Sequence, residues 1–107
     1  MFGSAYVASL QTKLIEMKTA TVSTAVKNMS DFSFSAGKAD QAAAAVITAR
    51  TGGLMVTWDG ATDPTATVGH LIPANTSLTI YGNAKIQALR LLREAGTDAV
   101  TTISLEA

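Results

Sequence analysis

The stretch between Leu54 and Gly82 constrains what this 107-residue chain can fold into more than any other part of it. Apolar and polar residues alternate near both of its ends, and Asp, Pro and Gly residues lie between them. Alternation is typical of strands with one buried face, whereas Asp, Pro and Gly favour the backbone conformations of tight turns. The stretch therefore predicts short strands joined by well-defined turns.

The first strand of this stretch is predicted to bury one face. Leu54, Val56 and Trp58 fall on one side at period two, which indicates a half-buried strand. An Asp-Gly pair and an Asp-Pro pair follow it, and both favour turns. We therefore expect a loop over residues 59–67.

Two further segments are predicted to form a β-hairpin. Leu78 and Ile80 alternate with polar residues before a Gly-Asn pair, and another apolar segment runs over 86–93. The spacing of Ile86 and Leu89 also fits a helix. The short length between two turn signals favours a strand instead.

Strands are also expected elsewhere in the chain. Residues 99–106 alternate and are rich in β-branched side chains, and 41–51 alternates despite a run of alanines that favours helix. Residues 19–26 are rich in Thr and Val, which is typical of a strand. Over 30–40, two phenylalanines alternate with serines, which predicts a short strand followed by a turn at Gly37.

The N-terminal residues allow two interpretations. Val7, Leu10, Leu14 and Met17 have the spacing of one face of a short helix, and an extended arm over 1–30 is the alternative. Short strands at regular intervals, with many turn residues between them, predict an all-β sandwich or barrel. The length fits a single domain over residues 1–107.

Charge and composition argue against several classes of partner. Eight basic and eight acidic residues cancel and are scattered, so we expect neither a nucleic acid nor a membrane surface as partner. No cysteine is present, which excludes thiol chemistry and disulfides. The first residues lack a basic leader and no long apolar run follows, so we expect neither a secretion signal nor a membrane span. Only 15% of residues are charged, which suits a protein that packs against other proteins.

Asp59, Asp63 and His70 lie close together in sequence and include oxygen and nitrogen donors that bind divalent cations. The two Asp residues are also turn formers, and a calcium loop needs more oxygen donors than this. Turn chemistry is the favoured interpretation, and we expect neither a metal site nor any other cofactor.

An enzyme is not expected either. His70 is the single histidine, so a Ser-His-Asp triad would have to use it with Asp59, Asp63 or Asp98. A Gly-x-Ser-x-Gly nucleophile motif is missing from the sequence. The glycines that follow strands do not have phosphate-binding spacing, so they are predicted to serve turns.

Two other kinds of side chain have a structural and a functional interpretation. Trp58 is predicted to point into the sandwich, and the alternative is a sugar-stacking platform with Tyr81 as a second ring. Arg90 and Arg93 fall on opposite faces of a strand. They could protect a sheet edge or bind acidic residues of a neighbouring subunit, which makes them candidate interface residues.

Several segments between positions 45 and 99 resemble small structural proteins that tailed bacteriophages encode among their head genes. The segments are Ala-Val-Ile-Thr-Ala, Val-Thr-Trp-Asp-Gly, Asp-Pro-Thr, Gly-His-Leu-Ile, Leu-Thr-Ile-Tyr-Gly, Ile-Gln-Ala-Leu-Arg-Leu-Leu-Arg and Thr-Asp-Ala. The likeness covers about the C-terminal two-thirds of the chain. The positions that carry over are structural: Trp58, Asp59, Gly60, Pro64, Gly69 and His70.

The resemblance implies a jelly-roll-like antiparallel β-sandwich in the virion, assembled in the host cytoplasm. It implies a non-enzymatic capsid decoration (cement) protein that forms a homo-oligomer and binds the major capsid protein or other virion subunits. The alternatives are a head-tail connector or stopper, a tail protein, or a carbohydrate-binding β-sandwich module.

Overall fold

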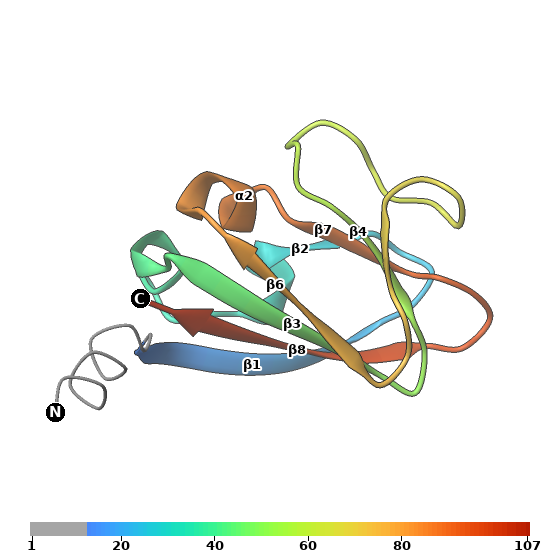
Figure 1. Cartoon of the computed structure of the whole chain (residues 1–107), viewed down its shortest axis with the longest axis horizontal. Helices are drawn as coiled ribbons and strands as arrows, with labels where there is room; N and C mark the ends of the chain where they lie inside the picture. The colour runs from blue at the N-terminus through green and yellow to red at the C-terminus, as the bar shows by residue number, and fades with distance from the viewer. Residues whose placement is uncertain (1–12) are drawn as a thin grey trace, which may run out of the picture.

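The computed structural model describes residues 13–107, which form two four-stranded sheets packed together (Figure 1). Sheet A contains, in spatial order, β1 (Leu14–Val22), β8 (Ala99–Glu106), β3 (Ala44–Arg50) and β6 (Thr76–Tyr81). Sheet B contains β2 (Lys27–Asn28), β7 (Arg90–Arg93), β4 (Leu54–Thr57) and β5 (His70–Ile72). Two 3-10 helices, η1 (Met29–Phe32) and η2 (Ala39–Gln41), and the helix α2 (Asn83–Gln87) join these strands.

The order of the strands is that of a jelly roll. β1 pairs with β8, β2 with β7, β3 with β6 and β4 with β5, always antiparallel. The chain thus follows one long hairpin whose successive strand pairs alternate between the two sheets, and the pairs β3–β8 and β4–β7 join it within each sheet. This confirms the expected all-β, jelly-roll-like antiparallel sandwich.

The core lies between the sheets and is built by the alternation that the sequence shows. Ile47 and Ile103 of sheet A are fully buried, as are Leu54, Val56 and Leu91 of sheet B. The strand predictions over 54–59, 99–106 and 41–51 are confirmed as β4, β8 and β3, with the predicted bounds for β8 and shorter ones for the other two. The expectation that the first of these buries one face only is wrong, because all four residues of β4 are buried.

The predicted hairpin over 78–93 is wrong. β6 pairs with β3 in sheet A, while the following residues form α2 and then β7 in sheet B. Ile86 and Leu89 are both fully buried, and a helical turn places residues three apart on one face, whereas on a strand they would face opposite sides. The Asn83 side chain also holds the start of α2, since its amide donates to the carbonyl oxygens of Ala39 and Ala42 at 2.9 Å.

The strand predicted within 30–40 is also wrong. Local hydrogen bonds form η1 instead: the Asn28 side chain accepts from the Ser30 amide at 3.0 Å, and Asp31 accepts from the Asn28 amide at 2.9 Å. The turn at Gly37 is present, with a positive φ of 78° at that residue.

The described part of the N-terminal segment belongs to the sheets. Leu14 and Met17, which fitted a helical face, lie in β1, and the expected strand over 19–26 begins as the end of β1. Residues 14–22 and 27–28 are therefore strands rather than a helix or a free arm, and η1 begins at Met29. Val7 and Leu10 lie outside the described residues, as does the rest of 1–12.

Replacing Ile47 by Ala tests this core. Ile47 is fully buried, so Ile47→Ala should lower the free energy of unfolding by about 2–5 kcal/mol, through lost burial and a residual cavity. Chemical denaturation followed by circular dichroism measures the change. Val46→Ala is the matched control, because Val46 lies on the outer face of the same strand and should cost clearly less. Equal losses for the two variants would contradict the assignment of faces.

Candidate functional site

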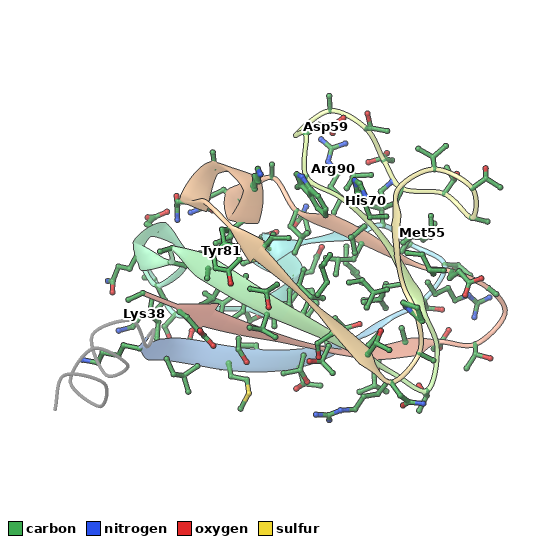
Figure 2. All side chains as sticks on the ribbon, viewed as in Figure 1. Lys38, Met55, Asp59, His70, Tyr81 and Arg90 are labelled. Carbon is green, nitrogen blue, oxygen red and sulfur yellow. The ribbon has the colours of Figure 1, made fainter. Side chains whose placement is uncertain are left out.

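The connection between β4 and β5, residues 58–69, carries most of the positions singled out in the sequence. It projects from the body of the sandwich (Figure 1). Asp59, Arg90 and His70 lie at this loop (Figure 2).

Asp59 organises the first turn of the loop. One carboxylate oxygen accepts hydrogen bonds from the amides of Ala61 at 3.0 Å and Thr62 at 2.8 Å, and the other accepts from the Thr62 hydroxyl at 2.6 Å. The Thr62 hydroxyl, followed by the two amides, stabilises the charged form and lowers the pKa of Asp59 from its ordinary value of 3.8 to about 2. The carboxylate is thus engaged in the turn that the Asp-Gly pair predicted.

Arg90 fastens the loop to sheet B. Its guanidinium donates to the carbonyl oxygens of Gly60 at 2.9 Å and Ala61 at 3.1 Å, and to the Asp63 carboxylate at 2.8 Å. The planar, multidentate guanidinium suits this set of acceptors, which a lysine would not satisfy. Hydrogen bonds to Asp59 within the loop and from Arg90 on β7 therefore hold the loop in one conformation.

Two structural positions complete the loop. Pro64 is fully buried. Gly69 has a φ of +127°, and a Cβ there would come within 2.9 Å of the Val56 carbonyl oxygen, so only glycine fits.

Trp58 lies at the margin of the core rather than at its centre. Its half-buried ring packs against the core and stacks on His70, with ring centroids 4.3 Å apart and planes 8° apart. Trp58 also lines a hollow of about 260 Å³ together with Leu78, Thr79, Ile80, Tyr81 and Lys85. The predicted inward direction of Trp58 is right, but the ring is also accessible from this hollow.

The groups considered for metal binding or catalysis are used separately. The Asp59 carboxylate accepts from the Thr62 amide in its own turn, Asp63 pairs with Arg90, and His70 stacks on Trp58. Asp98 accepts instead from the Ser23 hydroxyl and the Arg93 guanidinium, both at 2.7 Å, and these two groups lower its pKa. Among residues 13–107, no three His, Asp or Glu side chains gather as a metal site would require.

The two arginines proposed as interface residues both have partners within the chain. Arg90 pairs with Asp63 and Arg93 with Asp98, and all four side chains keep some exposure. Strand β7, which carries them, lies between β2 and β4 and is not at the edge of its sheet.

A further surface was missed by the sequence reasoning, namely the outer face of sheet A. The register places its side chains in four rows across the strands, which we call the outer rows. They are Leu14–Glu106–Ala44–Tyr81, Met17–Ser104–Val46–Thr79, Thr19–Thr102–Thr48–Ser77 and Thr21–Val100–Arg50. Alternation within each strand was visible in the sequence, but which strands are neighbours was not.

Comparison with protein-family models, curated proteins and solved structures finds no match to this chain. Within the described residues, no helix has the length and apolar character needed to cross a membrane.

The pH dependence of stability tests the Asp59 turn. Because the pKa of Asp59 falls from 3.8 to about 2 on folding, its stabilising effect is complete above pH 3.8 and is lost as the pH falls toward 2. The difference in unfolding free energy between the wild type and Asp59→Asn should therefore shrink over this range. Denaturation of both proteins at a series of pH values measures this difference. The titration of all other carboxylates is common to the two proteins and cancels in the difference. A difference that stays constant with pH would contradict the turn.

Proposed function

We propose that this protein is a non-catalytic structural component of a tailed-phage virion that decorates and stabilises the head shell. The observation that carries the proposal is the jelly-roll order of the strands. Viral capsid proteins are among the users of this architecture, together with lectins and cupins. Because one fold serves many functions, the surface has to agree with the proposal as well.

The loop at residues 58–69 supports a structural role. Its polar side chains are engaged in fixing its own backbone, through Asp59 and Arg90 above all. A rigid, preorganised loop loses little conformational entropy when it binds. Such a loop suits a docking contact better than chemistry on a substrate.

The low charge of the chain supports the same proposal. Only 15% of the residues are charged, and the exposed apolar side chains include Leu71 of sheet B, which is more than half exposed. Burial of such surface against shell subunits would stabilise a shell through many equal contacts, each of modest strength. The partner would be the major capsid protein or another virion subunit.

Imaging of virions that contain the chain tests the proposal. We expect many copies at symmetry-related positions over the shell, and shells stripped of the protein should bind it again and resist heating better. A single ring of copies at one vertex would favour a head-tail connector or stopper. Absence from particles, together with no binding to shells, would refute the virion role.

Carbohydrate binding is a second candidate, which the hollow beside Trp58 favours. Trp58 and the largely exposed Tyr81 both line it, with Thr79 and Lys85 as polar neighbours. Apolar faces of sugar rings stack on aromatic rings, while their hydroxyls bind polar side chains. The space of about 260 Å³ would hold a small sugar unit.

Fluorescence tests the second candidate, because Trp58 is the single tryptophan of the chain. If the hollow binds sugars, a glycan titration should shift the Trp58 emission, and Tyr81→Ala should weaken binding by about tenfold, the effect of losing one stacking ring. Thr67→Ala, in the exposed part of the loop, is the control and should bind normally. Unchanged emission with a broad set of glycans would remove this candidate.

A further inference from the structure

The outer rows of sheet A form a surface with almost no charge. Of their fifteen residues, Glu106 and Arg50 alone are charged, and these lie in the first and the last row. The two middle rows hold uncharged side chains throughout. A strongly charged partner would find nothing complementary there, whereas an equally uncharged surface would lose little by covering it.

The polar groups of this surface can be buried at low cost. The Thr19 and Thr102 hydroxyls bond to each other at 2.9 Å, and those of Thr48 and Ser77 at 2.8 Å. Each of these four hydroxyls therefore has a partner before any second molecule arrives, so covering them leaves none of the four unsatisfied. The side chains are also short, so little rotamer entropy is lost.

The surface is large enough for a weak but specific contact. Four strands at ~4.8 Å and four rows at ~6.8 Å give a face of roughly 500 Å², so two copies would bury on the order of 1,000 Å². This is about the minimum for a biological interface and is below the roughly 1,200–2,000 Å² of stable complexes, so the expected dimer is a weak one.

The edge of sheet A at β1 is guarded against strand pairing. The register places Glu16 in the row of Leu105 and Lys18 in the row of Ile103, so both charges lie on the inner side of an edge strand. A β-bulge between Leu14 and Glu16 further disturbs this edge. Inward charges and bulges are the usual means of preventing edge-to-edge association. Contact through the face is therefore favoured over contact through this edge.

The exposed apolar residues show how two copies would fit. Leu14 and Tyr81 lie at the two ends of one outer row, and they are 55% and 68% exposed. Met17 and Thr79 have the same relation in the next row. We consider a two-fold axis that lies between the two facing sheets, runs parallel to the strands and passes over the gap between β8 and β3. Such an axis places the β1 end of each row over the β6 end of the same row in the second copy.

We propose that two copies of this chain pair face to face through the outer rows of sheet A, about such a two-fold axis. Leu14 of each copy then covers Tyr81 of the other, and Ser104 covers Val46. This pairing does not depend on the virion role: a solution dimer that binds no shell would leave it standing while refuting that role.

A charge at the centre of the face provides the first test. Ser104→Glu would place a carboxylate over Val46 of the second copy without a partner, so the dimer dissociation constant should rise by at least about tenfold. Analytical ultracentrifugation of the full chain over a range of concentrations measures it. Thr67→Glu adds the same charge on the exposed loop and should leave dimerisation unchanged. Circular dichroism checks that both variants are folded.

Cross-linking provides a second test that does not need Ser104→Glu to fold. The chain has no cysteine, so Met17→Cys combined with Thr79→Cys introduces one thiol at each end of a row. Within a molecule these positions are three strand spacings apart, ~14 Å, beyond a short bismaleimide. We expect cross-linked dimers from the double variant and none from either single variant.

Three outcomes would overturn the proposal. They are a wild type that is monomeric at high concentration, a closed trimer, and equal cross-linking of the single and double variants.

Discussion

The pairing of β3 with β8 is the contact on which the rest of the structure depends. It joins the middle of the chain, Ala44–Arg50, to its last strand over seven paired positions, and these two strands are the centre of sheet A. β1 and β6 then add on either side, and the inward residues of both central strands supply much of the core. Because the paired residues are 50 to 62 positions apart in sequence, the fold is dominated by non-local contacts, a topology associated with slow folding.

Local interactions determine the parts between the strands. Asn28 and Asp31 close η1, Asn83 ties α2 to the segment around η2, and Asp59 closes the turn after β4. Arg90 is different, because it links this turn to a strand that follows it by thirty residues. The loop at 58–69 is therefore rigid through one local carboxylate and one distant guanidinium, and neither group is left free for chemistry.

The sequence predicted the fold class, three core strands and the Asp59 turn because their signals are local. Alternation over 99–106 or 54–57 needs no knowledge of the partner strand. It failed at 83–93, where the spacing of Ile86 and Leu89 fitted a helix but the short length between two turn signals favoured a strand. The tertiary position of α2, held by Asn83, decides for the helix. The outer rows of sheet A could not be predicted, since they require the pairing of strands that are distant in sequence. The contact of Trp58 with His70 depends on the pairing of β4 with β5 across the loop, which the turn signals alone do not specify.

The two proposals together restrict how a shell could be bound. If sheet A pairs two copies, its outer face is covered, and the large surface that remains is sheet B with the loop at 58–69. Sheet B has an apolar row of its own on that side, Leu92–Met55–Leu71, in which Met55 is buried although it lies outside the core between the sheets (Figure 2). A two-fold dimer would carry two such surfaces on its opposite sides. Because these two surfaces face away from each other, the dimer would contact two shell subunits only where it lies between them.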